Sequence, residues 1–261
     1  MDKRIKYWEK NYVEYWKDRV SDNSKNNLAK KDVLPPDLKI FKKYYKKALS
    51  YINKNSPTIL DIGIGFGRFA PLYKENFESN IWGSDISQGM VDECKKNYPE
   101  ISKQIKTAPA ETQPFKDASM DLIICWATFD ATFQDKTLWE FQRLLKIGGL
   151  ALITGKNDKY LATDKKALTA EINARKKGHP NYFTDINFLE QHIKDFGFEI
   201  VKLFKFKRRG DFANDLSTNE SSRKFYEYIL ILRKTAQGKN KHKIASKFSK
   251  VYKQIDKTIG E

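Results

Sequence analysis

Three glycines give the sequence its clearest candidate for a ligand-binding loop. Gly63, Gly65 and Gly67 alternate with other residues directly after the apolar run Thr58–Ile62. Glycine lets the backbone turn sharply and lets N–H groups approach a ligand without interference from a Cβ atom. The spacing is GxGxG, and Arg68 stands where the dinucleotide-binding pattern GxGxxG has its third glycine. The loop therefore predicts close approach of a ligand to the backbone, and it weakens the case for a dinucleotide.

A carboxylate follows the next apolar run. Asp85 closes the segment Asn80–Asp85, which we expect to be the strand after the glycine loop. A carboxylate at the tip of such a strand can accept both hydrogen bonds of a ribose diol. The alternative is that Asp85 caps the following helix, but Ser87 can serve as that cap. We therefore expect Asp85 to bind a ribose.

Short apolar runs alternate with helical segments around these residues. We expect helices near 66–77, 87–98 and 135–146, and strands at Thr58–Ile62, Asn80–Asp85, Ser102–Thr107, Met120–Trp126 and Leu150–Thr154. Apolar strands joined by helices at this spacing predict an α/β fold with a doubly wound parallel sheet, covered on both faces. The segment Lys146–Gly149 predicts a helix end and a tight turn into the next strand.

The flanking segments are predicted to be mainly helical. Residues 3–20 have an amphipathic pattern, and a second helix is expected from Pro36 to about Asn53. The N-terminal aromatic residues have two interpretations, as core or as a lid over a pocket: Trp8, Tyr12, Tyr15 and Trp16. Residues 238–261 predict an amphipathic, basic helix, which could dock on its own domain, on a second subunit of a homodimer, or on a membrane or nucleic acid.

In four segments the sequence resembles the class I S-adenosylmethionine-dependent methyltransferases, in particular their small-molecule branch. The segments are LDIGIGFGRFA, the strand ending in Asp85, APAETQPFKDASMDLIICW and EFQRLLKIGGLALIT. The resemblance runs from about Thr58 to Thr154. It implies a Rossmann-like, seven-stranded sheet whose last strand is antiparallel, with 198–207 and 226–233 as the final two strands. It also implies N-terminal helices, a C-terminal helical tail and S-adenosylmethionine as the cofactor.

The resemblance further implies a set of cofactor-binding residues. Asp61, Gly63, Gly65 and Gly67 would surround the amino acid moiety, and Asp85 would hold the ribose. Ile86, Ala110 and Glu111 would lie against the adenine, and Cys125 and Trp126 would lie beside the sulfonium. One departure concerns the adenine, because Pro109 occupies a position that is usually acidic in such enzymes. Glu111 is the expected substitute for that contact, unless it is a solvated loop carboxylate.

Methyl transfer needs alignment of the nucleophile and exclusion of water, and it needs a general base only where the acceptor must lose a proton. We expect Asp130, after the fourth strand, or His179, in the loop after the fifth, to be that base, with Tyr182 as a weaker candidate. The alternatives are that Asp130 caps a helix and that His179 is a surface residue. No metal is required, and no metal-ligand spacing is evident.

The amino-acid composition limits which partners and which cellular location are expected. The net charge of +16 is concentrated in the two ends of the chain, 1–54 and 201–261, while 55–200 is close to neutral. Basic ends could hold phosphates. However, Arg is the residue that binds phosphates bidentately, and Lys is much more frequent than Arg here. The positive charge is therefore better explained by a bias in composition. Only two cysteines and no long apolar stretch are present, which favours a cytoplasmic protein without a disulfide framework or a membrane span.

The resulting expectation is three regions and one leading function. Residues 1–54 form a helical lid or substrate region, 55–235 a class I methyltransferase domain, and 236–261 a basic amphipathic tail. The leading hypothesis is methylation of oxygen or nitrogen on a small-molecule acceptor. The alternatives are an RNA or other macromolecular methyltransferase that uses the basic ends, and a non-catalytic protein that only binds the cofactor.

Overall fold

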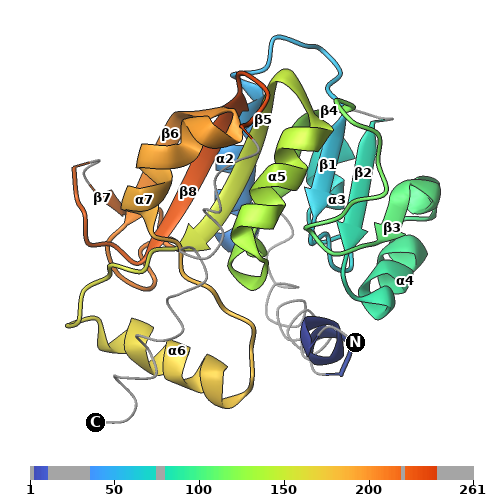
Figure 1. Ribbon diagram of the computed structural model, residues 1–261. Helices are drawn as coiled ribbons and strands as arrows, with labels where there is room; N and C mark the ends of the chain where they lie inside the picture. The colour runs from blue at the N-terminus through green and yellow to red at the C-terminus, as the bar shows by residue number, and fades with distance from the viewer. Residues whose placement is uncertain (1–2, 11–35, 75–79, 219–220, 240–261) are drawn as a thin grey trace.

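A single sheet forms the centre of the computed structural model, which describes residues 3–10, 36–74, 80–218 and 221–239 (Figure 1). Its strand order is β3-β2-β1-β4-β5-β8-β6-β7. The strands are β1 (Ile59–Ile62), β2 (Ile81–Asp85), β3 (Ile105–Thr107), β4 (Met120–Cys125), β5 (Leu145–Lys156), β6 (Phe198–Phe206), β7 (Ser217–Thr218) and β8 (Glu227–Lys234). The strands expected from the sequence are all present, with β3 shorter because the helical turn η1 (Pro99–Gln104) occupies its predicted beginning.

The direction of the strands follows the predicted topology. Strands β1 to β5 pair in parallel, and β8 inserts between β5 and β6 antiparallel to both. The expected sheet with an antiparallel last strand is therefore confirmed. The two-residue strand β7 pairs with the end of β6 and adds an edge strand beyond the seven that were expected.

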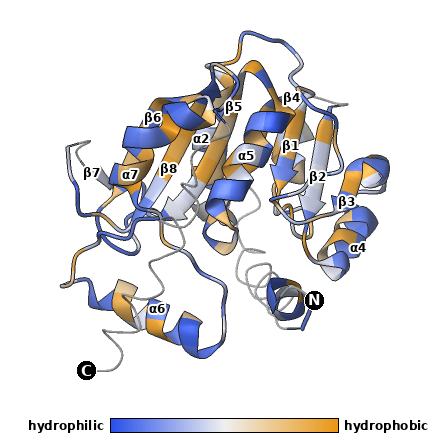
Figure 2. Ribbon diagram, viewed as in Figure 1, coloured by the Kyte–Doolittle hydropathy of each residue, from blue (hydrophilic) through white to orange (hydrophobic). Residues whose placement is uncertain are grey.

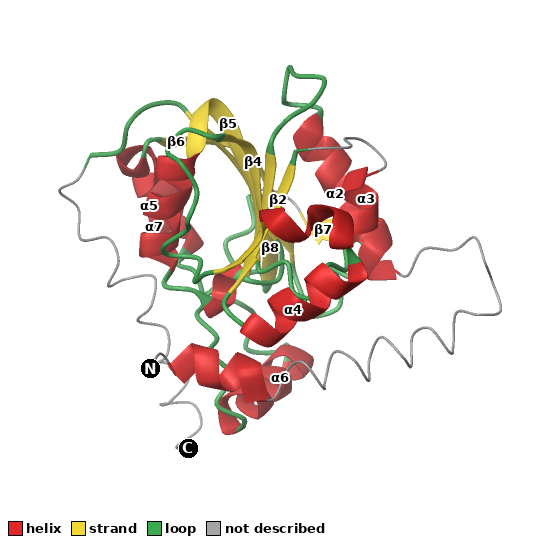
Figure 3. Cartoon of the chain, turned by 90° about the vertical axis from the view of Figure 1, so that its right-hand side faces the viewer, coloured by secondary structure: helices red, strands yellow, loops and turns green. Residues whose placement is uncertain are grey.

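Helices cover both faces of the sheet (Figure 3). Alternate residues of β4 serve opposite faces, as the geometry of a strand requires. Leu122 and Ile124 pack with α2 (Pro36–Leu49) and α3 (Ala70–Lys74). Ile123 packs with α5 (Gln134–Leu144) and α7 (Ile186–His192) on the other face. Burial of both faces explains why β4 and β5, near the middle of the sheet, are mainly apolar (Figure 2).

Aromatic packing on α2 positions one wall of the site described below. The ring of Phe41 lies 4.0 Å, between centroids, from that of Phe69 and 5.1 Å from that of Trp126. Phe41 is completely buried. Because Phe69 follows the glycine loop and Trp126 follows β4, α2 fixes the ends of two neighbouring strands relative to each other.

Two local features differ from the sequence prediction. The helix α6 (Lys165–Lys176) was not expected, because the segment is rich in lysine and only Ala167 and Glu171 are buried. Its N-terminus carries a recognisable cap, since Asp164 accepts a hydrogen bond from Ala167 N at 3.1 Å. The segment Lys146–Gly149 is not a separate turn: α5 ends at Leu144, β5 begins at once, and the glycines lie at an irregularity in its pairing with β4.

The ends of the chain are described only in part. Residues 3–10 are helical, and the remainder of the predicted helix 3–20, with Tyr12, Tyr15 and Trp16, lies outside the described residues, as does the predicted tail helix beyond residue 239. The segment 3–10 and α6 both lie beyond the carboxyl ends of the parallel strands (Figure 1). The remaining helices are α4 (Gln88–Asn97) and the short turns η2 (Phe129–Ala131) and η3 (Ile193–Phe196).

Candidate functional site

The glycine loop follows β1 directly. Gly63, Gly65 and Gly67 have positive φ angles of 81°, 56° and 87°, which residues with a side chain rarely adopt. A Cβ atom on Gly63 would overlap with the side chain of Thr128, and one on Gly67 would overlap with the ring of Tyr98. A Cβ atom on Gly65 would meet nothing within 4 Å. The backbone at Gly65 is therefore the part of the loop that faces open space.

Asp85 ends β2 and is held by two backbone N–H groups. Gly65 N donates to its Oδ2 at 3.0 Å, and Ser87 N donates to its Oδ1 at 2.9 Å. Ser87 is the cap of α4, because its Oγ accepts from Met90 N at 3.3 Å. Burial raises the pKa of Asp85 to about 6, although the hydrogen bonds from Ser87 and Gly65 lower it. The carboxylate is thus ionised at neutral pH and retains lone pairs for a ligand.

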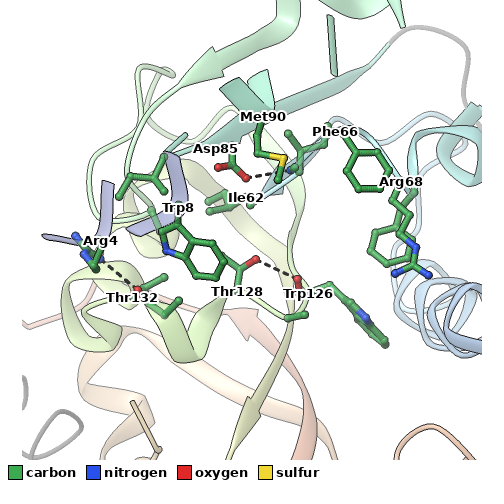
Figure 4. Close-up of a pocket in the computed structure, with 18 of the residues that line it drawn as sticks. Arg4, Trp8, Ile62, Phe66, Arg68, Asp85, Met90, Trp126, Thr128 and Thr132 are labelled. Carbon is green, nitrogen blue, oxygen red and sulfur yellow. Dashed lines mark hydrogen bonds between the residues drawn. The ribbon is translucent and has the colours of Figure 1, made fainter. Parts of the chain in front are cut away.

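A cavity of about 320 Å³ opens at the carboxyl ends of β1, β2 and β4 (Figure 4). Its walls are mainly apolar. Strand β1 has β2 on one side and β4 on the other, so the cavity lies at the point where the strand order reverses, which is the usual ligand crevice of open α/β sheets. The expected cofactor-site residues that line it are Gly63, Gly65, Asp85, Ile86, Ala110 and Trp126.

Four residues that the resemblance implied do not line this cavity: Asp61, Gly67, Glu111 and Cys125. The Asp61 carboxylate is 2% exposed and accepts a hydrogen bond from Tyr73 OH at 2.6 Å. Burial raises the pKa of Asp61 to about 7, against the effect of that hydrogen bond. Cys125 is completely buried between the sheet and α5. Successive strand residues point to opposite faces, so Trp126 reaches the cavity and Cys125 does not.

Glu111 binds the N-terminal segment instead of facing the cavity. Arg4 donates to its carboxylate at 2.6 Å and 3.3 Å, and Phe133 N donates at 2.6 Å. The Arg4 and Glu111 side chains are each 7% exposed. Because Arg4 and Trp8 also line the cavity, residues 3–10 form one of its walls (Figure 4). The alternative of a solvated Glu111 carboxylate is wrong.

A second cavity of about 260 Å³ adjoins the first. The two cavities have five lining residues in common: Trp8, Trp126, Ala127, Ala131 and Phe212. The other residues that line the second cavity are mostly polar and come from sequence-distant elements: Asp130, Thr154, Gly155, Lys156, His179, Arg209, Glu227 and Tyr228. The carboxyl edge of the sheet therefore carries an apolar cavity and a more polar one that share an aromatic wall.

Asp130, one of the two expected candidates for a general base, lines the second cavity as part of a charged cluster. Lys156 Nζ lies 3.0 Å from Asp130 Oδ2 and 3.4 Å from Glu171 Oε1. Burial lowers the pKa of Lys156, but the charges of these two carboxylates outweigh it and leave the pKa raised. The weaker candidate, Tyr182, is absent from the lining of both cavities, and its backbone N donates to Asp130 O at 2.6 Å.

His179, the other expected candidate, lines the second cavity next to the N-terminal segment. Its Nδ1 lies 3.1 Å from Tyr7 OH, and its ring centroid lies 5.2 Å from those of both Tyr7 and Trp8. Burial lowers the pKa of His179, although the charge of Asp130 raises it. The imidazole is therefore neutral at neutral pH, and a neutral imidazole can accept a proton.

Sequence reasoning missed several residues of the two cavities. Arg4, Phe212, Arg209 and Glu227 line them, and none lies in the segments that carry the resemblance. Glu227 could have been found from the sequence, because a charged residue at the beginning of an apolar strand lies where the strand enters the sheet. Arg4 had none, because its partner Glu111 is 107 positions away.

Two general features bear on the chemistry. Within the described part of the chain, no group of three or more His, Cys, Asp or Glu side chains is arranged to hold a metal ion. The same part contains no helix that is long and apolar enough to cross a membrane.

Comparison with known proteins assigns the central region. The family model described as a methyltransferase domain matches residues 60–153. The chain is 34% identical over 103 residues to an uncharacterized methyltransferase of Schizosaccharomyces pombe, a match that covers 39% of this chain and 40% of that protein. It is 33% identical over 112 residues to the demethylmenaquinone methyltransferase of Chlorobaculum parvum, covering 41% of this chain and 45% of that protein. The chain thus matches less than half the length of these relatives.

A solved structure extends the likeness in fold over most of the chain. The magnesium protoporphyrin IX methyltransferase of Synechocystis, determined with bound SAH, superposes with a TM-score of 0.58 at 16% identity, over 88% of this chain and 97% of that one. The segment that matches the family model begins in β1 and ends in β5, so it contains the glycine loop and the strands whose ends form the first cavity. Residues 60–153 therefore carry a methyltransferase domain, and the chain as a whole has the fold of solved methyltransferases.

Proposed function

We propose that the chain transfers a methyl group from S-adenosylmethionine to oxygen or nitrogen of a small molecule. The observation that carries this proposal is the adjoining pair of cavities, which share Trp8, Trp126 and Phe212. One cavity has the glycine loop and the carboxylate that suit a nucleoside, and the other brings charged and hydrogen-bonding side chains together. An acceptor in the second cavity would therefore meet the reactive end of a cofactor in the first.

The residues of the first cavity fit the cofactor. The open space at Gly65 and the ionised carboxylate of Asp85 lie together, which suits a ligand that carries a ribose diol. We assign the ribose to Asp85, the adenine to the apolar surface at Ile86 and Ala110, and the amino acid moiety to the loop at Gly63 and Gly65. Four further residues then stabilise the cavity from outside its lining, without contacting the cofactor: Asp61, Gly67, Glu111 and Cys125.

When bound, S-adenosylmethionine supplies a methyl group that its positively charged sulfur already activates. The protein must then align the acceptor and keep water away. Trp8 and Phe212 suit the second task, because their large apolar surfaces border both cavities. In the same proposal residues 1–54 form the lid and substrate region, 55–235 the catalytic domain, and 236–261 a basic tail.

The direct test is a transfer assay with cofactor labelled in the methyl group. The full chain is incubated with separate metabolite and RNA fractions, and the label in each fraction is measured. The proposal predicts labelled small molecules and unlabelled RNA. Binding of the cofactor without any labelled product in either fraction would contradict transfer and would favour a protein that only binds the cofactor.

A further inference from the structure

The second cavity contains one carboxyl group that no other residue engages. Glu227 is the first residue of β8 and pairs through its backbone with Lys156 and Phe206. Its side chain lines the cavity, and the described residues offer it neither a hydrogen bond nor an ion pair within 4 Å. Burial raises the pKa of Glu227 to about 7, against the charges of Lys156 and Arg209 and with those of Asp130 and Glu171.

The other two carboxylates in this region share one lysine as their partner. Asp130 and Glu171 both contact Lys156 Nζ, at 3.0 Å and 3.4 Å. Glu171 also accepts hydrogen bonds from Tyr226 OH and from Asn181 Nδ2. Lys156 therefore forms ion pairs with two other carboxylates and none with Glu227, which has no ion-pair partner of its own among the described residues.

The second cation of the cavity does not neutralise Glu227 either. Arg209 Nη1 donates to Tyr226 OH at 3.0 Å, and no ion pair joins Arg209 to Glu227 in the described part of the chain. His179 is neutral, because burial lowers its pKa. With its carboxyls ionised, the region therefore contains three negative side chains (Asp130, Glu171 and Glu227) against two positive ones, and a cation in the cavity would balance the charge.

The wall between the two cavities also suits a cation. Trp8, Trp126 and Phe212 line both cavities, and the rings of Trp126 and Phe212 lie 5.5 Å apart between centroids. Aromatic faces attract ammonium groups through the negative charge of the ring face. A cationic group drawn toward both Glu227 and this wall would lie on the side of the second cavity that borders the first.

We propose that the methyl acceptor is a small-molecule amine, which Glu227 binds in its ammonium form and whose proton Glu227 then removes. This proposal deepens the proposed function and rests on it. The proton passes from the ammonium nitrogen to the Glu227 carboxylate, and the freed lone pair forms the new N–C bond to the methyl carbon. The S–C bond breaks, and its electron pair stays on sulfur. The products are a methylated ammonium and a neutral thioether.

An amine matches this carboxyl better than a hydroxyl does. An alkylammonium group such as that of lysine ionises near pH 10.4, about three units from the pKa of Glu227. An alcohol hydroxyl, which resembles water, ionises at about 15.7, too far for a carboxylate of this pKa to remove its proton before transfer. A phenol ionises at about 10, as an amine does, but it brings no positive charge to balance that of Glu227. An amine is therefore the acceptor that meets both the charge and the proton transfer.

Matched pairs of probes test this inference on the full chain saturated with S-adenosylhomocysteine. The pairs are benzylamine with benzyl alcohol and isobutylamine with isobutanol, each alike in shape and different in charge at pH 7. Calorimetry is expected to show about tenfold or greater preference for the amine of at least one pair. Glu227→Gln should abolish the preference, and Glu190→Gln, the same change on an exposed face of α7, should retain it. Binding of the amine should also release protons near pH 7, measured as a dependence of the heat on the buffer.

The outcomes separate the two proposals. Saturation of the Glu227→Gln variant by S-adenosylhomocysteine shows that it is folded. Equal affinities for amine and alcohol in both pairs, including no measurable binding of any probe, would overturn the amine proposal, as would an amine preference that survives in Glu227→Gln. Failure of S-adenosylhomocysteine to bind the wild-type chain would instead contradict the proposed function itself. In the transfer assay, label on pooled amines supports the inference, and label only on pooled alcohols and phenols opposes it.

Discussion

At the scale of single residues, Asp61 shows what a buried carboxyl contributes to pH dependence. Its pKa in the folded chain is about 7, above the ordinary value of 3.8, because burial disfavours the charge. The folded state therefore binds a proton that the unfolded state has lost, and the free energy of unfolding rises as the pH falls from about 8 to about 5. One such proton contributes at most about 1.4 kcal/mol per pH unit.

We expect Asp61→Asn to reduce this rise in part, because Glu227 and Asp85 also have raised pKa values and contribute over the same pH range. Urea denaturation without ligand, at pH 5.5 and pH 8, measures it. Asp92→Asn on α4, where the wild-type side chain is exposed, is the control and should keep the wild-type difference between the two pH values. Identical pH dependence in the wild-type chain and in Asp61→Asn would show that Asp61 carries no such penalty.

Some site residues could be predicted from the sequence and others could not. Glycine spacing and a strand-end carboxylate were readable because both rest on local backbone geometry, and Gly65 and Asp85 do lie within hydrogen-bonding distance. The environment of Glu111 was not readable, because Arg4 reaches it only through the tertiary fold. The same holds for Asp130, whose contact with Lys156 depends on the pairing of β4 with β5.

At the scale of elements, the bend after β1 requires glycine for two separate reasons. Gly63 and Gly148 have nearly equal φ angles, 81° and 83°. A Cβ atom on Gly63 would overlap with Thr128, whereas one on Gly148 would meet nothing within 4 Å. Substitution by Ala should cost about 1–2 kcal/mol at either position for the left-handed conformation, and about 1–3 kcal/mol more at Gly63 for the overlap.

Urea denaturation of Gly63→Ala and Gly148→Ala measures this difference. We expect Gly63→Ala to be the less stable variant and to bind S-adenosylhomocysteine more weakly, while Gly148→Ala keeps wild-type affinity. Equal losses of stability in the two variants would mean that Thr128 does not constrain the bend.

Elements with strong periodicity were predictable and weakly patterned ones were not. The central strands, buried on both faces, appear as mainly apolar runs, interrupted by Asp61 in β1 and Asp121 in β4. Helix α6 buries only two side chains, so it lacks a clear apolar stripe, and its signals were the cap at Asp164 and a composition of good helix formers such as Ala, Lys and Glu. The glycines at 148 and 149 were assigned to a turn, because sequence alone does not distinguish a turn from an irregularity within a strand.

At the scale of the whole molecule, binding to RNA must be distinguished from methylation of RNA. The chain has a net charge of +16, which allows non-specific binding to nucleic acid. Such binding should fall steeply between about 50 mM and about 200 mM salt. We expect fluorescence polarisation with a labelled RNA to show this decline, and the transfer assay to leave RNA unlabelled at both salt concentrations. Salt-resistant binding together with labelled RNA would favour the macromolecular alternative.

The arrangement of two adjoining cavities was beyond prediction from the sequence. Its walls come from residues 3–10, the loops after β1, β2 and β4, the start of β8 and the loop after β6. The resemblance covers about residues 58–154 and therefore located the first cavity well. The second cavity depends on Arg209 and Glu227, which come together with Lys156 only because β8 lies between β5 and β6.

The most direct measurement is calorimetric titration of S-adenosylhomocysteine into the wild-type chain and into Asp85→Ala, with Asp92→Ala as the exposed control. Loss of a charged hydrogen-bond acceptor should weaken binding by about 1.5–3 kcal/mol in Asp85→Ala, and Asp92→Ala should bind as the wild type does. Wild-type affinity should also fall as the pH drops through about 6, where Asp85 becomes protonated, and Asp85→Ala should lose that dependence. Unchanged affinity in Asp85→Ala would remove this carboxylate from the cofactor site and contradict the assignment of the first cavity.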